Sequence, residues 1–169
     1  MHYELPYFGE INLDNLKEDY RTKARIAELQ ISLDLNFENK SIIAEKAEKI
    51  KQFLENISQM DKQHHPAIDK DFKEQKGETA DYIRFYLEEL DEEELRNIAG
   101  DYKNKSDLES RLLNKLKLVR VGLYPDGKYG TTHFGIFDYS IDIDGEPCNQ
   151  LLVLCTDDDG NINKITWES

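Results

Sequence analysis

The chain has 169 residues, of which 35 are acidic and 22 basic, so its formal net charge is −13. This balance disfavours binding to nucleic acids and to anionic membrane surfaces, because both require a positive protein surface. It fits a soluble cytoplasmic protein, and it also fits a protein that a basic partner reaches by electrostatic steering. The simpler interpretation, that the acidity serves solubility alone, stays open beside it.

The length favours one domain, 1–169, that buries enough surface to fold without disulfides or metals. No apolar stretch has the length of a signal-peptide core or of a membrane span. The two cysteines, Cys148 and Cys155, stand seven residues apart in an apolar segment. If that segment is one strand, about 23 Å separate them at about 3.3 Å per residue, which excludes a disulfide between them. We therefore expect free thiols, as in a reducing compartment.

The first part of the chain, about residues 3–37, is predicted to form strands. Apolar residues occupy every second position from Leu29 to Phe37, with polar residues between them. This alternation is typical of a strand with one buried and one solvated face. The residues from Tyr20 to Ala24 fit a hairpin partner, with the turn near 26–28.

The middle part, about residues 41–116, changes to helical spacing. Ser41 is expected to cap a helix over 42–63, because apolar residues recur there at steps of three and four. Pro66 disfavours helical geometry at the residue before it, so this helix is expected to end by His64. A second helix is expected to begin at Pro66 itself.

Three further helix starts follow from capping residues. Thr79 is expected to cap a third helix after the break at Gly77. Asp91 followed by Glu94 has the pattern of a capping box, and Ser106 followed by Glu109 has the same pattern. These two boxes predict two short helices before residue 116.

The last part, about residues 117–168, alternates strands with tight turns at Pro125–Gly127, Asp144–Gly145 and Asp157–Gly160. Such turns indicate an antiparallel meander. The order of strands, helices and strands predicts an α+β fold: an antiparallel sheet built from N-terminal and C-terminal strands, with the central helical segment packed on one face.

The stretch QHHPAIDKDF raises the possibility of a metal site. His64, His65 and Asp69 carry suitable ligand groups. Adjacent residues on a helix point in different directions, however, and a zinc site needs at least three protein ligands. A polar junction between two helices is the favoured interpretation, with the metal site as an alternative.

Two acidic stretches have competing interpretations. Asp157, Asp158 and Asp159 lack the alternating spacing of a calcium-binding loop, so a hairpin turn is favoured. The run EELDEEE is either a solvated helix start or a surface for a basic partner. Its candidate partner-binding residues are Glu88, Glu89, Asp91, Glu92 and Glu93.

Four segments carry a resemblance to a known family: LPYFGEINLDNL, ISLDLNFENKSI, LKLVRVGLYPDGKYG with FGIFDYSI, and ITWES. In these segments the chain resembles the uncharacterised bacterial family catalogued as domain of unknown function two thousand and four. The resemblance covers nearly the whole chain and implies a cytoplasmic bacterial protein with strands, helices and strands in that order. It implies no activity and no catalytic residue.

We expect a non-enzymatic, acidic protein-binding module that engages a basic partner, as toxin-immunity proteins do, and that needs no cofactor. The basis is the net charge together with the lack of a nucleophile motif, a phosphate loop or a dinucleotide fingerprint. The alternative is a small metal-dependent hydrolase. It would use His64, His65 and Asp69, or a pocket around Arg120, Asp138 and Tyr139, where Arg120 and Asp138 are expected to pair across neighbouring strands.

Overall fold

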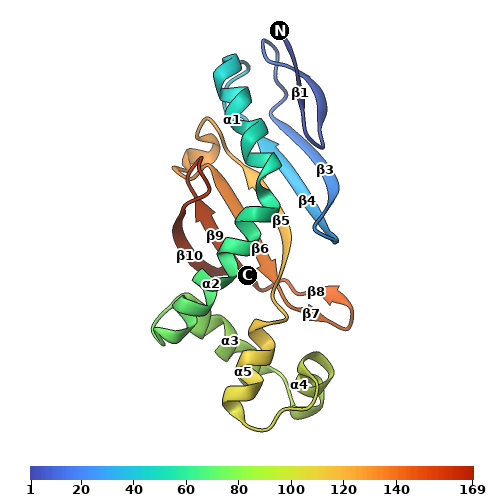
Figure 1. Cartoon of the computed structure of the whole chain (residues 1–169), viewed down its shortest axis with the longest axis vertical. Helices are drawn as coiled ribbons and strands as arrows, with labels where there is room; N and C mark the ends of the chain where they lie inside the picture. Colours follow the sequence, from blue (N-terminus) through green and yellow to red (C-terminus); the bar gives the residue numbers. More distant parts are fainter.

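A mixed sheet of six strands forms the centre of the molecule, in the order β10-β9-β6-β5-β4-β3 (Figure 1). The computed structural model describes all residues from 1 to 169. N-terminal and C-terminal strands share this sheet, which confirms the predicted α+β fold. Its strands are β3 (Asp19–Ile26), β4 (Leu29–Asn36), β5 (Lys117–Leu123), β6 (Gly135–Ser140), β9 (Leu151–Thr156) and β10 (Ile162–Glu168).

The sheet is not wholly antiparallel, and the prediction is wrong at one pairing. β4 and β5 run parallel, with Ser32 opposite Arg120 and Asp34 opposite Gly122. All five helices lie between these two strands in the chain. A connection of that length returns the chain to the same end of the sheet, as a parallel pair requires.

Two short ribbons stand outside the main sheet. The first strands, β1 (His2–Leu5) and β2 (Gly9–Asn12), pair only with each other, and β1 contacts the first helix. A second ribbon, β7 (Asp142–Ile143) with β8 (Glu146–Pro147), turns at Asp144 and Gly145 as predicted. It projects from the end of β6 beside the helices of the lower half (Figure 1).

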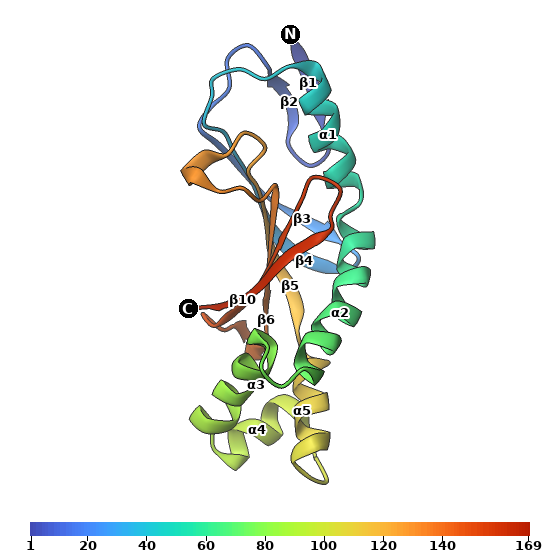
Figure 2. The same ribbon diagram turned by 90° about the vertical axis from the view of Figure 1, so that its left-hand side faces the viewer.

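The helices cover one face of the sheet and one end of it. Figure 2 shows α1 and α2 along one face, α3 to α5 gathered at the lower end, and no α-helix on the opposite face. We call that uncovered side the open face. No helix is long and apolar enough to cross a membrane. The helices are α1 (Ala44–Glu55), α2 (Ile57–Lys73), α3 (Glu78–Glu89), α4 (Glu92–Ala99) and α5 (Lys105–Leu113).

The expected helix junction at the two histidines is wrong. The break falls at Asn56, and Pro66 lies inside α2. Proline removes the bond to the carbonyl of the residue four positions earlier, here Lys62. Both Lys62 and Pro66 are on the exposed side of α2, so water can hydrate the released carbonyl while the buried side stays packed on the sheet.

Three predicted helix caps are also wrong, and one is confirmed. Ser41, Thr79 and Ser106 do not cap: the residues at those ends are Ile43, Gly77 and Asn104. Thr79 instead donates its backbone N–H to Asp71, at 2.9 Å, so the preceding helix supplies the acceptor. The box at Asp91 and Glu94 forms with both of its hydrogen bonds.

The core lies between the sheet and the α1–α2 layer. In β4 the apolar residues Ile31, Leu33 and Leu35 are fully buried against the helices, as the alternation predicts. The polar residues between them therefore point to the open face. That face keeps several buried polar groups, which bear on the candidate sites below.

Candidate functional site

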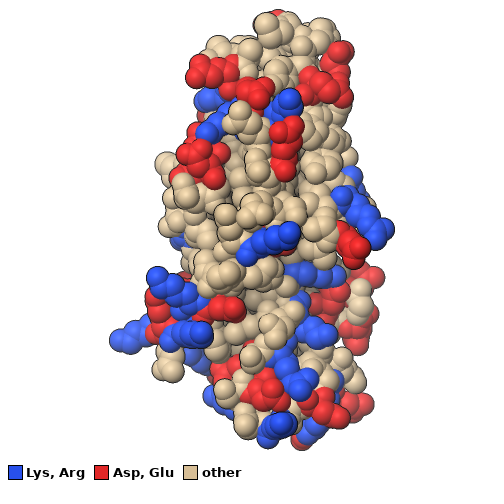
Figure 3. Space-filling view, in the orientation of Figure 1, with Lys and Arg blue, Asp and Glu red and all other residues tan.

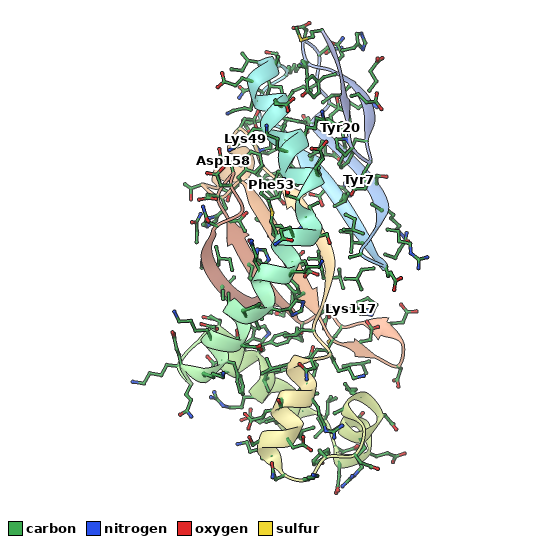
Figure 4. The ribbon with its side chains drawn as sticks, in the orientation of Figure 1. Tyr7, Tyr20, Lys49, Phe53, Lys117 and Asp158 are labelled. Carbon is green, nitrogen blue, oxygen red and sulfur yellow. The ribbon has the colours of Figure 1, made fainter.

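A groove of about 400 Å³ lies between α4 and the β7–β8 ribbon, and Glu94 is the residue of the acidic run that lines it. We call this the acidic groove. Figure 3 shows acidic side chains over the ribbon and a mixture of acidic and basic side chains toward α4, and Figure 4 places Lys117 beside the ribbon. The groove is lined by Glu94, Asn97, Ile98, Lys115, Lys117, Asp142, Ile143, Asp144 and Gly145.

The five carboxylates predicted to bind a partner are all exposed, but they are not equally free. Asp91 caps α4, and Glu92 pairs with Arg96 at 2.8 Å. Glu88, Glu89 and Glu93 make no ion pair within the chain. These three side chains are available to an outside cation.

The ribbon adds acidic groups that sequence reasoning missed. Asp142, Asp144 and Glu146 alternate along five residues that contain no basic side chain. Lys117 binds one carboxylate oxygen of Asp142, while the other oxygen, Oδ1, is buried without a hydrogen-bond partner. An unpaired buried acceptor of this kind is costly. The alternation of these acids across the Asp-Gly turn was the available signal.

A second cluster lies on the open face around Arg120. The pairing of Arg120 with Asp138 is confirmed: the two residues are opposite each other in β5 and β6, and Nη1 donates to the carboxylate at 3.0 Å. Arg120 also binds Asp34 through two parallel bonds of 2.7 and 2.8 Å. Tyr139, expected in the same pocket, points to the opposite face, toward α2.

Burial and charge act against each other in this cluster. Burial lowers the pKa of Arg120, but the adjacent Asp34 and Asp138 outweigh that effect and raise it above its usual value. Burial disfavours the charged form of Asp138 too, which for an acid raises the pKa. The guanidinium of Arg120 only partly offsets this rise. Such an arrangement fixes the side chains in one geometry, because each buried charge depends on its partner.

A glycine in β5 makes room for this cluster. A Cβ atom on Gly122 would lie 2.5 Å from Arg120 Nη2 and 2.9 Å from Asp34 Oδ2. The guanidinium and the carboxylate therefore meet directly over the position where a side chain would stand. Glycine inside a strand often marks such a close approach, so this residue was a signal that sequence reasoning did not use.

The histidine cluster lies on the other face, between α2 and β6. Tyr139 donates to Asp61 at 2.8 Å, so its oxygen accepts from His64 Nδ1 at 3.1 Å. His65 stands 3.5 Å from the same Asp61 oxygen. His64 is 1% exposed, and burial lowers its pKa to about 4.

The metal-ligand trio considered for the alternative hydrolase is not brought together. His64 is turned inward, whereas Asp69 is exposed further along α2. The hydrogen bond with Asp61 raises the pKa of His65. Burial tends to raise the pKa of Asp61, but hydrogen bonds from His65 and Tyr139 prevail and lower it. This cluster ties α2 to the sheet.

Three aspartates bring their oxygens within 4.8 Å of one another, in the turn at Asp157, Asp158 and Asp159. Asp157 accepts from the backbone of Asp159 and of Asn161, as a turn residue does. Lys49 from α1 reaches Asp159 at 2.6 Å and Asp158 at 3.9 Å, and it points toward this turn in Figure 4. A lysine therefore already supplies the positive charge beside these carboxylates.

No protein-family model matches the chain, and comparisons with curated proteins and with solved structures find no match either. The resemblance described above therefore stays an expectation. Several of the residues that carry it lie together on or beside the open face: Asp34, Asn36, Arg120, Gly122, Tyr124 and Asp138.

Proposed function

We propose that this protein is a non-catalytic binding module whose acidic groove engages a basic protein partner. The observation that carries the proposal is a groove with carboxylates on both sides: Glu94 at the start of α4, next to the exposed acids of 88–93, and Asp142 and Asp144 on the ribbon. Two lysines, Lys115 and Lys117, also line the groove, and Lys117 is paired with Asp142. A partner that presents basic side chains there would meet carboxylates on both sides.

The balance of paired and unpaired groups supports an outside ligand. Glu88, Glu89 and Glu93 have no cation within the chain, and Asp142 Oδ1 lacks a donor. An arginine or lysine from a partner would pair with these three exposed carboxylates. Much of the gain in affinity would come from a faster association rate, because the opposite charges of the two proteins steer their encounter.

This chemistry resembles the neutralisation of a basic toxin by an acidic immunity protein, and that is the form of partnership we favour. It requires no catalytic group in the module itself. It also predicts a strong dependence on ionic strength, because exposed charges are screened beyond about 8 Å at physiological salt.

The location is tested by nuclear magnetic resonance with a short arginine-rich peptide as the probe. Amide shifts are expected in 88–98 and 142–146, and they should fade as salt is added. Equal shifts at other exposed acids, such as Glu4 and Glu28, would show only general attraction to a −13 chain and would contradict a specific site.

A further inference from the structure

We propose that a second groove, on the open face of the sheet, binds a small organic anion that carries a planar ring. This groove has a volume of about 610 Å³, within the range of about 300 to 1,000 Å³ that is typical of small-molecule sites. We call it the open-face groove. It is lined by Arg21, Thr22, Lys23, Ser32, Leu33, Asp34, Asn36, Arg120, Tyr124 and Tyr129.

The floor of the groove is built from fixed polar groups. Asp34 and Asn36 are 9% and 5% exposed, and Asn36 donates to Asp34 at 2.6 Å. Arg120 donates to Asp34, to Asp138 and to the hydroxyl oxygen of Tyr124. These bonds use four of its five N–H groups, so Arg120 organises the floor and has one donor to spare.

The remaining free groups in the groove are mostly donors. Tyr124 accepts from Arg120, which leaves its own hydroxyl proton free to donate. Lys23 and Ser32 lie opposite each other on β3 and β4, and Ser32 lies opposite Arg120 on β5. Arg21 uses only Nε to bind Asp19, so its two terminal nitrogens are free. Such a set favours an anionic group of the ligand.

The charge of this groove contrasts with that of the whole chain. Its lining has three basic side chains and one carboxylate, although the chain carries a net charge of −13. Lys23 makes no ion pair with any residue of the chain. Arg21 is paired with Asp19, and Arg120 with Asp34 and Asp138, so Lys23 is the cation left to meet a phosphate or a carboxylate on a ligand.

The upper wall of the groove is aromatic. Tyr129 is 77% exposed, and its ring centroid lies 6.3 Å from that of Tyr124. Its φ angle of 60° is unusual for a residue other than glycine. An exposed aromatic ring held in a strained backbone conformation above a polar floor is suited to stacking on a planar group.

Hydrogen bonds to the segment after β4 position this wall. The loop after β5, visible in Figure 2 on the open face, is joined to the segment after β4. Asp126 accepts from the backbone N–H groups of Glu38 and Asn39, both at 2.8 Å. Lys128 is buried and donates to the carbonyl of Phe37 at 3.1 Å. The wall is thus set before any ligand arrives, which reduces the entropy lost on binding.

The test is isothermal titration calorimetry of the full chain with four probes: adenosine monophosphate, benzoate, adenosine and inorganic phosphate. We expect adenosine monophosphate or benzoate to bind with a dissociation constant below about 1 mM. Binding of the first identifies a phosphate site, and binding of benzoate alone identifies a carboxylate site. Adenosine and inorganic phosphate, which each lack one feature, should bind at least about tenfold more weakly.

Variants at exposed positions connect the binding to this groove. Lys23→Ala and Tyr129→Ala should each weaken the better probe about tenfold, because each removes one main contact. Lys62→Ala, which removes an exposed lysine on the helical face, should leave binding unchanged. The proposal would be overturned if neither anionic probe bound at a concentration 10 times the expected dissociation constant. It would also be overturned if adenosine bound as tightly as the better anionic probe, or if that probe bound all three variants equally well.

Discussion

Arg120 shows how one residue organises the open face. Its guanidinium joins β4, β5 and β6 through Asp34 and Asp138, and it reaches the loop through Tyr124. Removing Arg120 would leave two buried carboxylates without their shared partner, which typically costs several kcal/mol. The arrangement depends on the empty position at Gly122.

Gly122→Ala is expected to lower the free energy of unfolding by about 1 to 3 kcal/mol, as overpacking does. The added methyl would displace Arg120 from Asp34, because the two nearest atoms would lie at 2.5 and 2.9 Å. Urea denaturation measures the change. Ser32→Ala, on the neighbouring strand, is the matched control and should alter stability by less than about 0.5 kcal/mol. An unchanged stability of Gly122→Ala would mean that Arg120 is not held over this position.

His64 gives the fold a pH dependence with a definite sign. Burial depresses its folded pKa from 6.5 to about 4, so the unfolded chain binds this proton more readily than the folded one. The stability it contributes is full above pH 6.5 and is lost as the pH falls toward 4. The loss for this one group is roughly 2 to 3 kcal/mol.

His64→Gln should remove that part of the pH dependence. We expect the decrease in unfolding free energy between pH 7.5 and pH 4.5 to be smaller in the variant than in the wild type, by about 2 kcal/mol. Chemical denaturation at both pH values measures it. The same decrease in both proteins would show that His64 is not held neutral in the fold.

At the scale of the helices and strands, local patterns predicted what a single segment determines. The alternation from Leu29 to Leu35 correctly gives a strand and its buried face, and Asp91 with Glu94 gives a true capping box. The parallel pairing of β4 with β5 was missed, because nothing in either strand records which partner it meets. Only the packing of the helices brings those strands together.

The two histidines show why the candidate sites were harder to predict. Pro66 gave a sound local reason for a junction, but the contacts of His64 with Tyr139 hold α2 on the sheet and the helix continues through the proline. Asp61 and Tyr139 are 78 residues apart in the chain. The pairing of Arg120 with Asp138 was predictable, since the two residues lie on strands that flank one turn. The second partner of Arg120, Asp34, lies in the N-terminal group of strands, far away in the sequence.

Pro66→Ala tests this account of α2. Because Pro66 lies inside a helix, alanine should restore a backbone hydrogen bond and remove a clash, which raises stability. Proline also restricts the unfolded chain, an effect of about 1 kcal/mol in the opposite direction. We expect a net gain of about 1 to 2 kcal/mol by thermal or chemical denaturation. A loss of stability would instead support a helix start at residue 66.

At the scale of the whole molecule, the two grooves occupy different regions. The open-face groove lies under the loop after β5, whereas the acidic groove lies between the ribbon and α4 at the opposite end of β5. The proposed partner and the proposed small ligand would therefore bind at the same time without sharing a residue. The proposed binding function depends on the acidic groove alone.

The most direct test of that function is capture of partners from a lysate of the native host, at about 50 and 500 mM salt, with two charge variants. The first carries Glu88→Gln, Glu93→Gln and Asp144→Asn; the second, with the same change in charge, carries Glu4→Gln, Glu28→Gln and Glu74→Gln. We expect a basic protein to bind the wild type and the second variant at low salt. It should be lost at high salt and from the first variant, since screening and neutralisation remove the same attraction. A partner that binds both variants equally, or that resists high salt, would contradict a function based on the acidic groove.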